Sequence, residues 1–167
     1  NNSYSDNATA DSDEVVIDLN DNTMTSERGV VVTNGNMKGL FYRLERDPVT
    51  GEITFTNNAL LNISQPTGNI KIETEGGKVS QKDEKGEFYN SFAYINVAKM
   101  TGAEAPNDKI YFGSPYIKYE DEKIYAKDAW VTTDFNIVNF QKEPQKAGYH
   151  LFSSDVLVEP DKQITLK

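Results

Sequence analysis

Residues 110–127 read IYFGSPYIKYEDEKIYAK, and residues 150–167 read HLFSSDVLVEPDKQITLK. When the second stretch is laid on the first, residue by residue, Phe152 falls on Phe112, Ser154 on Ser114 and Ile164 on Ile124. Each copy reads as a strand, a polar kink, a second strand, an acidic turn and a third strand. A repeat of fixed period is typical of stacked supersecondary units.

The preceding residues continue this pattern of short strands and turns. Asn34-Gly35 between two apolar runs predicts a hairpin. Pro and Gly in 47–51 and the charged run 82–86 predict two more turns. Helical periodicity is nearly absent, and only residues 97–105 could form a short turn of helix. Short alternating strands with turns about every 8–12 residues predict an all-β sandwich, roll or barrel.

Composition limits the classes of partner. The net charge of −9 argues against nucleic acids and against electrostatic docking to an anionic membrane. No apolar run approaches the roughly 20 residues of a membrane-spanning helix. Residues 1–14 are rich in Asn, Ser and Asp and are expected to form a disordered polar tail. Residues 15–167 are expected to form a single β domain.

The chain offers little for catalysis. It has no Cys, and His150 is its only His. Ser153, Ser154 and Asp155 follow that His, but neighbouring side chains on one strand point to opposite faces and do not converge as a triad requires. Residues 18–22 resemble the start of a calcium loop, but the Gly and the bidentate Glu of such a loop are missing. We therefore expect no enzymatic activity, no catalytic residue, no metal site and no cofactor.

The repeated unit resembles the OstA-like family, the periplasmic LptA and LptC proteins of lipopolysaccharide transport. Members repeat a phrase of Gly, an apolar strand, a small residue with Asp, a second strand, an acidic turn and a third strand. Residues 148–167 follow this phrase closely, and 68–80 match its middle. Residues 58–61 and 128–131 match the strand after the small-residue corner. The resemblance extends over 15–167.

The resemblance implies an antiparallel β-jelly-roll, or twisted open roll, whose two sheets enclose an apolar groove. Such a groove would shield acyl chains from water, and open sheet edges would dock with related β-jelly-roll domains. It further implies a periplasmic, exported protein, anchored through a preceding segment or free, with lipopolysaccharide or a related lipid as its partner. The residues expected on the groove face are Leu40, Tyr42, Ile53, Phe55, Leu61, Ile63, Ile70, Ile72, Phe92, Ile110, Phe112, Ile124, Val131, Phe152, Val156 and Ile164.

Alternation of apolar and polar residues does not separate an open groove from a closed core. Two other functions stay open at this point. The chain could be a secreted structural subunit that polymerises by strand pairing. It could also be a carbohydrate-binding β-sandwich that uses Trp130 and surface Tyr residues. Exposed, coplanar aromatic rings would favour sugar binding, and inward-facing rings would favour a lipid.

Overall fold

The computed structural model describes residues 2–5, 8–11, 16–18, 23–65, 68–80, 82–96, 109–133, 143, 148, 150–159 and 163–167. These residues form an all-β protein, a single antiparallel sheet of twelve strands. The strands are β1 (Asn2–Ser5), β2 (Ala8–Asp11), β3 (Val16–Asp18), β4 (Thr23–Asn34), β5 (Met37–Arg46), β6 (Glu52–Gln65), β7 (Gly68–Ser80), β8 (Lys85–Asn96), β9 (Lys109–Glu120), β10 (Lys123–Thr132), β11 (Leu151–Glu159) and β12 (Gln163–Leu166).

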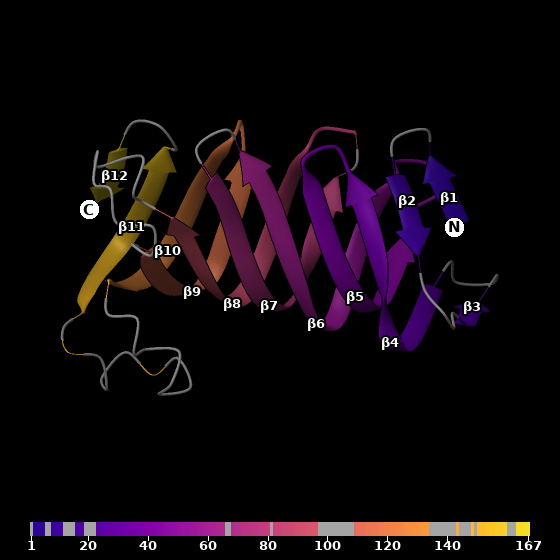
Figure 1. Ribbon diagram of the computed structural model, residues 1–167, viewed down its shortest axis with the longest axis horizontal. Helices are drawn as coiled ribbons and strands as arrows, with labels where there is room; N and C mark the ends of the chain where they lie inside the picture. Colours follow the sequence, from indigo (N-terminus) through magenta and orange to yellow (C-terminus); the bar gives the residue numbers. More distant parts are fainter. Residues whose placement is uncertain are drawn as a thin grey trace.

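The strands follow one another across the sheet in chain order, with one exception. Both β2 and β3 pair with β4, so β3 lies off the main order. Figure 1 shows them along the long axis of the molecule, from β1 near the N-terminus to β12 near the C-terminus. The long strands curve round, so that halves of the same strands form two facing layers. We call residues 30–34, 37–41, 59–65, 68–74, 91–96, 109–114, 129–132 and 151–153 the first arm. The second arm comprises residues 23–26, 43–46, 52–56, 76–80, 85–89, 116–120, 123–127 and 155–159.

The line where the arms meet is the corner. The register shifts there in the β4–β5, β5–β6 and β6–β7 pairings, whereas the pairings from β7 to β11 keep their register. In β6, residues 53 and 55 are buried, residues 57 and 58 are exposed, and burial resumes at 59. The β6–β7 pairing skips the same residues, passing from Phe55 opposite Gly77 to Ala59 opposite Thr74. Extra residues at a bulge bend a strand. Here they also keep the apolar side chains of both halves on one face, so the bent strand encloses its own core.

The core fills the space between the arms. Phe41 on the first arm and Phe55 on the second lie with ring centroids 4.9 Å apart. The largest fully buried side chains include Tyr119, Phe88 and Phe112. Apolar residues of every strand from β4 to β11 belong to one continuous cluster, with Ile164 of β12 packed against it. The inner face is therefore packed by its own side chains.

The predicted turns are confirmed: Asn34-Gly35 joins β4 to β5, residues 47–51 join β5 to β6, and a turn at 82–84 joins β7 to β8. In each repeat copy, the two strands before the acidic turn were predicted as separate. In the structure they form one continuous strand, and Ser114 and Pro115 bend β9 without ending it.

Residues 1–14 were expected to lie outside the fold, yet β1 and β2 extend the sheet beside β4. Backbone pairing needs no apolar side chain, which is why composition alone does not reveal these strands. The helical turn predicted at 97–105 lies outside the described residues. Among those described, no helix has the length and hydrophobicity needed to cross a bilayer.

Candidate functional site

The inner face carries most of the residues predicted for a lipid groove. Two of them, Ile110 and Ile164, are partly buried and pack against the core cluster from its margin. Ten are buried within the cluster: Ile53, Phe55, Leu61, Ile63, Ile70, Ile72, Phe112, Ile124, Val131 and Val156. They come from both arms, so a ligand held among them would lie between the two layers.

Four predicted groove residues lie elsewhere. Leu40 and Phe92 point to the outer face, because the core side of their strands is formed by Phe41 and Ala93. Tyr42 occupies the β5 bulge, between the register pairs of Phe41 and Arg43, and is partly exposed.

The fourth, Phe152, is 72% exposed, whereas its repeat counterpart Phe112 is 1% exposed. The reason lies in the register. Phe112 pairs with Val131 on one side, and on the other side Val131 pairs with Leu151, not with Phe152. The structural counterpart of Phe112 is thus Leu151, one residue before Phe152, which the sequence match sets on Phe112. A slip of that size turns a strand side chain to the opposite face.

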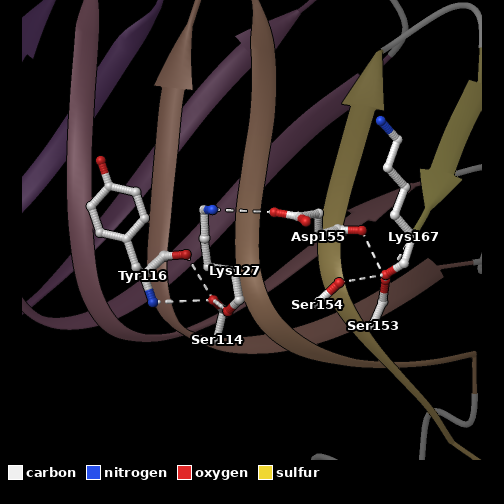
Figure 2. Close-up of polar contacts among 7 residues, drawn as sticks. All are labelled: Ser114, Tyr116, Lys127, Ser153, Ser154, Asp155 and Lys167. Carbon is white, nitrogen blue, oxygen red and sulfur yellow. Dashed lines mark hydrogen bonds and ion pairs between the residues drawn. The ribbon is translucent and has the colours of Figure 1, made fainter.

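Three hydroxyl side chains hold the corner together. Ser114 Oγ lies 2.7 Å from the carbonyl of Tyr116 and also contacts the carbonyl of Lys127 on β10. Ser153 Oγ lies 2.8 Å from the carbonyl of Asp155 and 2.5 Å from that of Lys167, and Figure 2 shows the two arrangements side by side.

Thr74 is the third corner hydroxyl. Its Oγ1 lies 2.9 Å from the carbonyl of Gly76 and 2.8 Å from that of Tyr89 on β8. Each of the three therefore contacts the carbonyl two residues ahead and one on the next strand, where the regular ladder is interrupted. The even-numbered strands turn the corner differently, with left-handed residues at Asn57, Asn58, Asn90 and Asp128. Asn and Asp tolerate that conformation better than most residues.

Opposite the corner, the hairpin tips of the two arms meet in a polar seam. Asn36 Nδ2 and Gln65 Nε2 of the first arm each lie 3.5 Å from the hydroxyl of Tyr119 on the second. Gln65 Nε2 also donates to the carbonyl of Glu122 at 3.2 Å. Tyr119 is 1% exposed and belongs to the core cluster, so this seam lies directly over the apolar interior.

The outer face is hollowed along the corner. A depression of about 930 Å³ is lined by Tyr42, Phe92 and Trp130, among others. Trp130 packs on Phe92, with centroids 5.8 Å apart and planes tilted by 35°, and Gly113 leaves the space that its indole fills. Trp130 is half-buried against its neighbours rather than part of a flat exposed platform, so the arrangement is that of sheet packing.

The outer face of the second arm is covered by paired charges. The ion pairs there include, among the described residues, Lys78–Glu87, Lys118–Glu120, Lys123–Glu159 and Lys127–Asp155. The hydroxyl of Tyr116 donates to Glu87 at 2.7 Å. This bond lowers the pKa of Glu87, and the ion pair with Lys78 lowers it further by a smaller amount. Burial, together with the bond to Glu87, raises the pKa of Tyr116 to about 12.

The residues weighed for catalysis do not converge. Both Ser153 and Ser154 direct their hydroxyls at the carbonyl of Lys167, and the ring of His150 packs edge-on against Phe152. Within the described part of the chain, no three His, Cys, Asp or Glu side chains gather as metal ligands would.

Comparison with solved structures finds a similar fold in LptH of Pseudomonas aeruginosa, described as the LptA homologous periplasmic component of the conserved lipopolysaccharide transport device. The two chains superpose with a TM-score of 0.53 over 72% of this chain and 81% of LptH, at 14% sequence identity. No family model matches the sequence, and no curated protein does. The likeness defines the class of fold: an LptA-like twisted β-jelly-roll, as the family resemblance of the repeat implies.

Proposed function

We propose that this chain is a periplasmic lipid-transport module, which holds lipopolysaccharide-like acyl chains between its two arms and docks edge to edge with related domains. The observation that carries the proposal is the continuous inner apolar face, to which both halves of the long strands turn their apolar side chains. The resemblance of the repeat and the fold shared with LptH support it.

The interior suits acyl chains in its chemistry. Each methylene group that leaves water contributes about 0.8 kcal/mol, so a lipid can be held without any catalytic or charged group. The inner face is closed in this conformation. An acyl chain would therefore have to displace side chains as the arms separate, with the bent corner serving as the hinge.

The seam is the point of entry that this function requires. Its contacts are side-chain hydrogen bonds of 3.2–3.5 Å between hairpin tips, whereas the corner is continuous backbone. Net contributions of about 1 kcal/mol for each such bond make the seam the weaker of the two boundaries.

Docking would use the edges of the sheet. Among the described strands, β12 pairs only with β11 and leaves the first-arm end of β11 uncovered on that side. Leu151 and Phe152 at that end are 55% and 72% exposed. An uncovered edge with exposed apolar side chains is a template for another strand.

The test is a cross-link across the seam. Because the chain has no Cys, Gln65→Cys with Glu122→Cys introduces a unique pair that a short bis-maleimide can join. The matched control joins Glu45→Cys and Thr54→Cys, two exposed register partners on the second arm alone. Uptake of purified lipopolysaccharide is followed by native mass spectrometry.

We expect the uncross-linked proteins and the cross-linked control to take up lipid. The cross-linked seam should block uptake, and protein loaded before cross-linking should retain its lipid. If the wild-type chain takes up no lipid, and none co-purifies from a lipopolysaccharide-producing host, the proposed function is wrong. Uptake that the seam cross-link leaves unchanged would place the lipid elsewhere.

A further inference from the structure

The outer face of the first arm carries apolar side chains in register. Val31 pairs with Leu40, and Leu40 pairs with Leu60. These three side chains line an outward-facing hollow of about 400 Å³, a volume within the range of small-molecule sites. Leu60 is 47% exposed, although it lies in the middle of the longest strand.

A row of basic and amide side chains borders this hollow on the side of the hairpin tips. Lys38 pairs with Asn62, which pairs with Lys71, and all three line the hollow. The Nζ of Lys71 lies 6.0 Å from the centroid of the Tyr94 ring, which also lines the hollow. The Nζ of Lys109 lies 4.9 Å from the same centroid.

The charge of this border differs from that of the outer face of the second arm. The lysines of the second arm described above are paired with carboxylates at 3.0–3.8 Å. In the part of the chain that the structure describes, neither Lys38 nor Lys71 has a carboxylate within ion-pair distance. The whole chain carries a net charge of −9, so two cations on either side of Asn62, beside an apolar hollow, are a local feature. An apolar floor with a cationic border is complementary to a ligand that has an apolar tail and an anionic head.

We propose that this hollow binds a single-chain fatty carboxylate. Its alkyl chain would lie along Val31, Leu40 and Leu60, and its carboxylate between Lys38 and Lys71. The carboxylate in the lining, Glu73, pairs with Leu60. It therefore lies toward the corner, at the end of the hollow away from Lys38, and orients the ligand with its head at the tips. The site lies on the opposite side of the sheet from the proposed interior lipid site and does not depend on it.

The test is calorimetric titration of the full chain with sodium laurate. Wild-type protein should bind at one site, and binding should weaken as salt rises from about 50 to about 500 mM, because the head-group contact is electrostatic. Lys38→Glu combined with Lys71→Glu should weaken binding about tenfold or more, and Leu60→Asn should have an effect of similar size. Dodecanol, with the same chain and no charge, should bind about tenfold more weakly.

Lys82→Glu combined with Lys85→Glu, in and beside the exposed β7–β8 turn, makes the same change of charge away from the hollow and should leave the affinity unchanged. Circular dichroism checks the fold of each variant, and Leu60 is exposed enough for Asn to be accommodated. Absence of laurate binding, equal binding by the Lys38/Lys71 variant, or loss of binding on cross-linking the seam would each overturn the proposal. The last result would locate laurate in the interior instead, and lipopolysaccharide uptake in the same proteins tests the proposed function separately.

Discussion

Two serines on the corner, Ser91 and Ser114, provide a matched pair for testing how the bend is stabilised. They are register partners on β8 and β9 and are almost equally buried, at 6% and 7% exposure. Ser114 Oγ contacts the carbonyls of Tyr116 and Lys127 and accepts from the amide of Tyr116 at 3.1 Å. Ser91 Oγ is buried and has no hydrogen-bond partner among the described residues.

The two substitutions to Ala should therefore differ. Ser114→Ala removes the contacts of this hydroxyl with two carbonyls and one amide at the corner, which costs about 1–3 kcal/mol in free energy of unfolding. Ser91→Ala removes a hydroxyl that was desolvated without compensation, so we expect no loss of stability or a gain of up to about 1 kcal/mol. Both variants keep the same backbone propensity and side-chain volume change, so the difference between them isolates the hydrogen bonds.

Urea unfolding followed by circular dichroism measures the effect. With a slope of about 2 kcal/mol/M, a loss of about 2 kcal/mol lowers the midpoint by about 1 M. The fluorescence of Trp130, the single Trp, provides an independent probe of the same transition. Equal midpoints for the Ser91 and Ser114 variants, or a larger loss for Ser91→Ala, would refute the role given to the corner hydroxyls.

Three other substitutions test the outer face and the edge. Gly113→Ala places a Cβ 2.3 Å from Trp130 Nε1, so it should cost about 1–3 kcal/mol and change the Trp emission spectrum. The bond from Tyr116 lowers the pKa of Glu87 below its ordinary 4.5. The ionised carboxylate therefore stabilises the folded state above pH 4.5, and this contribution to the free energy of unfolding is lost as pH falls through the folded pKa. In Tyr116→Phe, the Glu87 pKa measured by NMR should therefore rise, and an unchanged value would contradict the bond. Phe152→Lys should reduce any self-association of the chain in analytical ultracentrifugation, since charged edges resist pairing.

Alternation and turn residues were enough to predict an all-β fold, and the family resemblance of the repeat implied the twisted β-jelly-roll. The sequence match between the two repeat copies holds for the strand after the acidic turn, β10 in one copy and β12 in the other, because Ile124 and Ile164 both pair with Val158 from opposite sides. Lys127 and Lys167, which the same match places together, also accept the corner contacts of Ser114 and Ser153 with their carbonyls.

The inner face could not be assigned as well as the fold, because β5 and β7–β11 change the parity of their buried residues at the corner, whereas β4 and β6 keep it. In β9, buried Phe112 and Ser114 are even-numbered, whereas buried Ile117 and Tyr119 are odd-numbered. The polar kink marked the position of this change, but not how many extra residues it contained. Ser153 makes both contacts equivalent to those of Ser114, whereas Ser154 Oγ shares only the contact with the carbonyl of Lys167. This difference of one residue between the two copies places Phe152 on the outer face.

A packed interior is compatible with the proposed carrier if opening and loading occur together. The three seam hydrogen bonds contribute about 3 kcal/mol, which four methylenes entering the interior would offset at about 0.8 kcal/mol each. Parting the arms also exposes residues such as Tyr119 and Ile63, and only the acyl chain itself can cover them. The acyl chain must therefore enter while the arms separate. It follows that weakening the seam, for example by Gln65→Ala, should raise the rate of lipid uptake more than the equilibrium affinity.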